Sequence, residues 1–146
     1  MAVRPVVSLV TLGVSDLAKS TAFYQALGWP LSSSSVPGVV SFFRTSGGLL
    51  GLYGTDELAA DSNQAPIPLG PGYRGITVAI NLDGPAEVDA AIAEAVAAGG
   101  SVLKAARATD WGGYSGYFAD PDGHAWEVAH NPGWPTGVDG RPMLPQ

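Results

Sequence analysis

The sequence contains no cysteine and few basic residues. Without cysteine, the 146-residue chain has no disulfide framework, no thiolate metal site and no cysteine nucleophile. Its seven Lys and Arg residues are outnumbered by 13 Asp and Glu residues, which gives a formal net charge of −6. Seven scattered cations do not form a stripe that follows a phosphate backbone, so nucleic acids and anionic membrane surfaces are disfavoured as partners.

Long apolar runs are also missing. No stretch reaches the roughly 20 residues that a membrane-spanning helix needs, and residues 1–10 lack the apolar core of a signal peptide. With 46% hydrophobic and 14% charged residues, the composition is that of a globular protein rather than a disordered one. We therefore expect a soluble cytoplasmic protein whose single domain spans residues 1–146.

Two parts of the sequence predict the same order of elements, strand–helix–strands. In the first part, strands are expected at residues 6–14, 39–45 and 49–53, with a helix at 17–27 and a further edge strand near 31–36. In the second part, strands are expected at residues 74–82, 101–108, 114–119 and 124–130, with a helix at 85–98. Asp16 is the expected cap of the first helix, and Val88, Ile92 and Val96 the expected core stripe of the second.

The repeated order predicts an α+β protein made of two duplicated modules. They span about residues 6–54 and 73–131, and residues 132–146 form a tail. The stretch 54–72 contains three prolines and no periodicity, so it predicts a connector with one helical turn near residues 56–60.

The last predicted hairpin contains the leading functional candidate. Asp120-Pro121-Asp122-Gly123 is typical of a tight turn between two strands. Because side chains alternate along a strand, Trp126 and Val128 are expected to pack on a helix while Glu127 faces the other way among alanines. A carboxylate on a floor of small residues indicates an open concavity, since a closed apolar core would not keep it charged.

Two stretches resemble a known family. VTLGVSDLAKSTAFYQALGW at residues 10–29 resembles the first module of the vicinal oxygen chelate superfamily, which includes glyoxalases, bleomycin-resistance proteins and extradiol dioxygenases. GYFADPDGHAWEV at residues 116–128 is similar to the last hairpin of that superfamily. The resemblance implies two tandem βαβββ modules, whose curved mixed sheets form a cleft and are commonly completed in a homodimer.

The resemblance also implies four metal-ligand positions, which hold His, Glu or Gln in metal-using members. In this chain they fall at Leu9, Gly51, Thr77 and Glu127. Only Glu127 is a strong ligand, and odd spacing on a strand directs His124 and His130 away from it. We therefore expect no cofactor and no strong metal site, with weak binding of a divalent metal by Glu127 as the most that this set allows.

Further ligand contacts are expected from polar and aromatic residues near the cleft. These candidates are Thr11, Phe42, Arg44, Tyr53, Thr77, Asn81, Trp111, Tyr114 and Tyr117. A structural role competes for several of them. Trp111 and Tyr114 fit equally well as core residues of a bulged, glycine-rich strand, and Arg44 fits better as a strand-end arginine that reaches solvent.

The predicted function is binding of a small aromatic or cationic compound without the usual metal. Antibiotic sequestration of the bleomycin-resistance kind needs no catalysis, and an acidic groove suits a cationic drug. The alternatives are a lyase or isomerase of the same superfamily that uses Glu127 as general base, a weakly metal-dependent glyoxalase-like enzyme, or a dimeric interaction module without a ligand.

Overall fold

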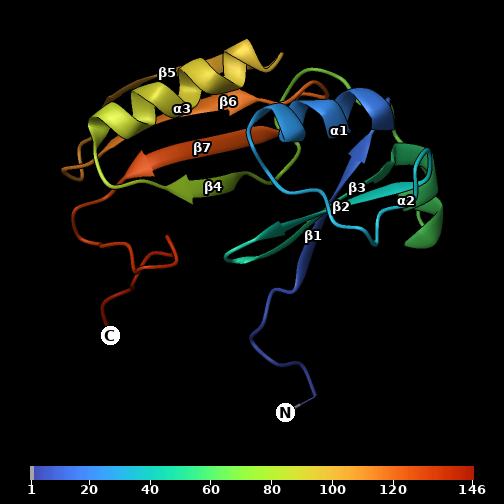
Figure 1. Cartoon of the computed structure of the whole chain (residues 1–146), viewed down its shortest axis with the longest axis horizontal. Helices are drawn as coiled ribbons and strands as arrows, with labels where there is room; N and C mark the ends of the chain where they lie inside the picture. Colours follow the sequence, from blue (N-terminus) through green and yellow to red (C-terminus); the bar gives the residue numbers. More distant parts are fainter. Residues whose placement is uncertain (1) are drawn as a thin grey trace. The chain divides into compact units, whose positions relative to one another are not determined.

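The computed structural model describes residues 2–146 and forms two compact units, of which the first ends at Pro68 and the second begins at Leu69 (Figure 1). The first unit contains β1 (Leu9–Val14), α1 (Leu17–Ala26), β2 (Val40–Thr45), β3 (Gly48–Gly54) and α2 (Thr55–Asp61). The second unit contains β4 (Val78–Asn81), α3 (Pro85–Ala97), β5 (Ser101–Ala108), β6 (Tyr114–Ala119) and β7 (Ala125–His130). The fold is α+β with two βαβββ-like modules, as the sequence predicts.

The sheet of the first unit has the order β1-β3-β2, with β1 parallel and β2 antiparallel to β3. Helix α1 begins after Asp16, whose carboxylate accepts a hydrogen bond from the Lys19 amide at 3.0 Å, as predicted. The helix packs on one face of the sheet, where the rings of Tyr24 and Phe43 lie 5.8 Å apart. Both side chains are fully buried, so this face forms the core of the first unit.

The sheet of the second unit has the order β4-β7-β6-β5, with β4 parallel to β7 and the other pairs antiparallel. Helix α3 covers one face, on which Phe118 and Trp126 stack with their rings 6.3 Å apart. Gly116 lets the helix approach closely, because an added Cβ would lie 2.7 Å from the Ile92 side chain. The second unit thus has its own helix-covered core.

Several predicted elements have different limits in the structure. Strand β1 begins at Leu9 rather than residue 6, because its pairing with β3 begins at Leu49. Strand β4 begins at Val78 rather than residue 74, because its pairing with β7 begins at Trp126. The edge strand expected near residues 31–36 is reduced to isolated bridges, and the expected turn near 56–60 is the seven-residue helix α2.

The core stripe of α3 also differs from the prediction. Val88 is buried as expected, but Val96 is 46% exposed and Ala95 is buried in its place. Seven residues make almost two full helical turns, so Ala95 lies above Val88 while the eighth residue is rotated away. None of the helices within the described residues is long and apolar enough to span a bilayer.

Candidate functional site

Glu127 lies at the centre of the second unit's sheet. Its register partners are Ala79 on β4 and Tyr117 on β6. Residues directly opposite each other share a face, so the Tyr117 and Glu127 side chains are neighbours. The predicted alternation along this strand is confirmed, since Trp126 and Val128 are buried on the α3 side. Glu127 is half-buried on the face that α3 does not cover.

Tyr117 and Glu127 interact electrostatically. Burial raises the pKa of the Tyr117 hydroxyl, and the charge of the Glu127 carboxylate and its hydrogen bond with the phenol raise it further. The phenol is therefore protonated at neutral pH and donates to the carboxylate.

Small side chains surround the pair. Ala125 and Ala129 are on the same side of β7 as Glu127, and Ala79 is its partner on β4. Lys104 on β5 pairs with Tyr117 and extends the row in the other direction. Lys104 was not among the predicted site residues, because only the register of β5 against β6 places it there. The backbone register thus aligns Glu127, Tyr117 and Lys104 across three adjacent strands.

The equivalent place in the first unit is filled by the unit's own side chains. Gly51 on β3 pairs with Thr11 on β1 and Phe42 on β2. A Cβ at Gly51 would lie 3.1 Å from the Thr11 hydroxyl oxygen, 3.3 Å from Leu9 Cδ1 and 3.5 Å from the Phe42 ring. The space above Gly51 is therefore occupied, and none of these contacts supplies a strong metal ligand.

The donor set does not fit the metal ion of metal-using superfamily members. Thr77 lies exposed before β4 and offers only a hydroxyl. Both histidines have contacts elsewhere: His124 Nδ1 is 3.2 Å from the Arg74 guanidinium, and His130 Nδ1 is 3.2 Å from the Leu82 carbonyl oxygen. Within residues 2–146, no three His, Cys, Asp or Glu side chains come together in a group that could hold a metal ion.

One predicted aromatic residue, Tyr114, lies on the opposite face of the sheet from Glu127. The Tyr114 hydroxyl donates a 2.8 Å hydrogen bond to Asp89 on α3, and this contact raises the pKa of Tyr114. The structure therefore places Tyr114, half-buried, on the helix side of the sheet. Trp111 is 52% exposed and its ring lies directly against Gly113, where an added Cβ would collide with it.

The remaining candidates are spread over both units. Arg44 is exposed near the end of β2, two residues beyond Phe42 on the same face. Asn81 is the half-buried last residue of β4, opposite Ala129. Tyr53 is half-buried at the end of β3, where it lines a pocket of about 700 Å³.

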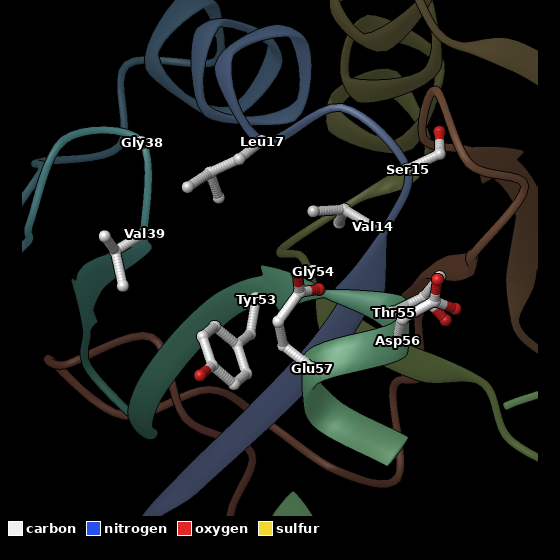
Figure 2. A pocket seen from close by; sticks show the side chains of 10 residues that line it. All are labelled: Val14, Ser15, Leu17, Gly38, Val39, Tyr53, Gly54, Thr55, Asp56 and Glu57. Atoms are coloured by element: carbon white, nitrogen blue, oxygen red, sulfur yellow. The ribbon is translucent and has the colours of Figure 1, made fainter. Parts of the chain in front are cut away.

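That pocket belongs to the first unit (Figure 2). Its lining consists of Val14, Ser15, Leu17, Gly38, Val39, Tyr53, Gly54, Thr55, Asp56 and Glu57. Of these residues only Tyr53 was predicted as a ligand contact. The others come from the end of β1, a loop, the start of α1 and a segment interpreted as a connector, so no motif in the sequence marks them.

The comparisons with known proteins agree with this fold. The sequence model of the Glyoxalase/Bleomycin resistance protein/Dioxygenase superfamily matches residues 7–128. A glyoxalase-related enzyme from Fulvimarina pelagi is 36% identical, over 97% of this chain and 99% of that chain, with a TM-score of 0.85. Lactoylglutathione lyase from Agrobacterium tumefaciens is 27% identical, over 88% of this chain and 95% of that chain, with a TM-score of 0.67.

A glyoxalase/bleomycin resistance protein/dioxygenase from Nocardioides is 29% identical over 88% of this chain and 84% of that chain, with a TM-score of 0.72. No curated protein matches the sequence. The superfamily match extends over both βαβββ-like modules and includes the DPDG hairpin that presents Glu127. The chain therefore belongs to the glyoxalase/bleomycin resistance protein/dioxygenase superfamily.

Proposed function

We propose that this chain binds a small aromatic or cationic organic compound at Glu127 and does not use the metal ion of metal-using superfamily members. The observation that carries the proposal is the Tyr117–Glu127 pair, half-buried beside the small side chains of Ala79, Ala125 and Ala129. Such a pair offers a fixed negative charge next to an aromatic ring, with little side-chain bulk around it.

The chemistry of this pair selects a particular kind of ligand. A carboxylate attracts an ammonium or guanidinium group, and the face of a tyrosine ring attracts the same cations. The net charge of −6 also favours the approach of a cationic compound. Binding of this kind sequesters a compound without catalysis.

The test is isothermal titration calorimetry with bleomycin and with simple aromatic amines. Glu127→Gln keeps the size and hydrogen-bonding capacity of the side chain but removes its charge. We expect about tenfold weaker binding, the usual scale for losing a hydrogen bond to a charged group. Glu94→Gln on the exposed face of α3 is the matched control. Equal affinities of the two variants would contradict the proposal.

The same pair supports a second function, that of an isomerase or lyase. In this reaction the Glu127 carboxylate removes a proton from a carbon next to a carbonyl. Once protonated, Glu127 no longer needs the Tyr117 hydrogen bond, so the phenol can donate instead to the enolate oxygen that develops. Glu127→Gln then lowers kcat by roughly 10²–10⁴-fold with the fold intact. Exchange of that proton with deuterated solvent distinguishes this reaction from binding alone.

Metal binding is tested separately. A divalent cation held by Glu127 and water alone binds weakly, because strong sites need three or four protein ligands. We expect less than stoichiometric retention of zinc, nickel or iron after gel filtration. One tightly bound metal ion per chain, whose removal by a chelator abolishes activity, would contradict the proposal that the chain works without a metal.

We also propose that the chain forms a homodimer, as the superfamily resemblance implies. Several apolar residues before and at the start of β1 are exposed in the single chain, among them Val6, Val7 and Leu9. Burial of such residues against a second copy is a common source of dimer stability. Light scattering at several concentrations measures whether the particle has twice the mass of one chain.

A further inference from the structure

The pocket of the first unit lies at the end of its sheet, where β1 and β3 terminate. Its volume of about 700 Å³ is within the range of small-molecule sites, roughly 300–1,000 Å³. Val14, Leu17 and Val39 form apolar walls, and the ring of Tyr53 lies on another side (Figure 2). The pocket therefore has the size of a small-molecule site and an apolar wall beside its polar residues.

The charged groups of the pocket all have the same sign. Asp56 and Glu57 line it from the first turn of α2, and none of its ten lining residues, all within the described part of the chain, is Lys, Arg or His. No basic side chain in residues 2–146 forms an ion pair with Glu57. A concave surface lined by charge of one sign concentrates the negative potential within it.

The Glu57 side chain is exposed, and its carboxylate lies next to the backbone of the residue before α2. It lies against Gly54, where an added Cβ would collide with Oε2. In Figure 2 the Glu57 side chain extends past Gly54 toward the interior of the pocket, facing the apolar walls. Tyr53 and Thr55 also line the pocket and each carries a hydroxyl group. A carboxylate opposite an apolar wall is complementary to a molecule with a cationic end and an apolar body.

We propose that this pocket binds a small organic cation, namely a primary ammonium group on an apolar or aromatic body. The ammonium group is paired with Glu57, and the body packs against Val14, Leu17 and Val39. This site is separate from the one at Glu127, which belongs to the other sheet, and the two proposals do not depend on each other.

The test uses three probes of similar size and different charge: 2-phenylethylammonium, neutral 2-phenylethanol and anionic 3-phenylpropanoate. Methyl-labelled protein is titrated with each probe and followed by NMR. We expect saturable shifts of the Val14, Leu17 and Val39 methyl signals with the ammonium compound, weaker binding of the alcohol, and the weakest binding of the carboxylate. Equal affinity for the alcohol and the ammonium compound overturns the proposal, as does the absence of saturable shifts at these methyls.

Three substitutions examine the role of Glu57. Glu57→Gln removes the charge while a glutamine at this helix position still supports the first turn, and it should weaken ammonium binding roughly two- to fivefold, the effect of an exposed ion pair. Gly54→Ala keeps the charge but displaces the carboxylate, so it should have a similar effect. Asp61→Asn, in the last turn of α2 and outside the pocket, is the control and should leave affinity unchanged.

Glu127→Gln separates this inference from the proposed function. This variant should leave unchanged both the shifts of the pocket methyl signals and the affinity for the ammonium probe, whatever it does to ligands bound at Glu127. If Glu127→Gln abolishes binding of the ammonium probe while Glu57→Gln does not affect it, the pocket is not a cation site. Binding lost in Val39→Trp, which fills the pocket from an exposed position, supports the proposal, whereas unchanged binding in this variant overturns it.

Discussion

The central strands β3 and β7 of the two sheets are directly comparable. Each pairs in parallel with the first strand of its unit and antiparallel with the strand before it. In the first unit the residue at the middle is Gly51, covered by Thr11 and Phe42. In the second unit it is Glu127, with Ala79 and Tyr117 as partners.

The difference shows that a shared backbone register does not imply shared chemistry. At Gly51 the large side chains belong to the neighbouring strands and fill the space where a ligating group would stand. At Glu127 the neighbour on one side is an alanine and the neighbour on the other donates a hydrogen bond. The two sheets are thus alike on their helix-covered faces and unlike on their opposite faces.

The helix-covered faces provide the largest expected effect. Phe43 and Trp126 are both buried against the helix of their unit, at 0% and 3% exposure. Replacing either with alanine removes a large aromatic side chain from a packed core, so each should lower the free energy of unfolding by about 3–5 kcal/mol. Urea unfolding followed by circular dichroism measures both. A loss in only one of the two variants would show that the helix-covered faces are not equivalent.

Gly51→Glu tests whether the first unit can accept the residue of the second. The new side chain must displace Leu9, Thr11 or Phe42, which stand within 3.5 Å of its Cβ. We expect a loss of about 1–3 kcal/mol in unfolding free energy, the usual cost of overpacking. Gly70→Glu is the control, because Gly70 has open space around it. If the two variants are equally stable, the site above Gly51 is not filled.

Glu127→Gln has the smallest expected effect on stability but a specific effect on Tyr117. Without the carboxylate charge, the pKa of Tyr117 should fall toward its ordinary value of 10.0, while burial keeps part of the increase. Absorbance of the phenolate, measured against pH in a Tyr114→Phe background, follows this change. An unchanged titration curve would show that Tyr117 and Glu127 do not interact in solution.

The same pair makes stability depend on alkaline pH. The raised pKa means that the folded state holds the Tyr117 proton more tightly than the unfolded chain does. The resulting stabilisation is fully present below about pH 10 and is lost as the pH rises through the folded pKa. In Glu127→Gln this loss should be smaller, which unfolding curves at neutral and alkaline pH can measure.

Sequence patterns were most informative where a local signal had one physical meaning. Asp16 caps α1, and Pro85 occupies the first position of α3. The Asp120 carboxylate accepts hydrogen bonds from the Asp122 and His124 amides at 3.0 and 2.9 Å, as expected of an Asp-Pro-Asp-Gly turn. Alternation along the last strand separated Glu127 from Trp126 and Val128.

Patterns were less informative where the outcome depended on a distant partner. Residues 6–8 and 74–77 have strand-forming sequences, but strand pairing begins only at Leu9 and Val78. Tyr114 is compatible with either face of a glycine-rich strand, and a hydrogen bond to Asp89, 25 residues away, places it on the helix side. Register and long-range hydrogen bonds are set by packing rather than by local sequence.

The sequence by itself determined the α+β order, the superfamily resemblance and the unusual ligand positions Leu9, Gly51, Thr77 and Glu127, because these follow from residue identity and short-range periodicity. Only the tertiary structure decided that Tyr117 donates to Glu127, that Leu9, Thr11 and Phe42 cover Gly51, and that Glu57 faces an acidic pocket. Those contacts join residues from different strands and helices, so they exist only once the chain has folded.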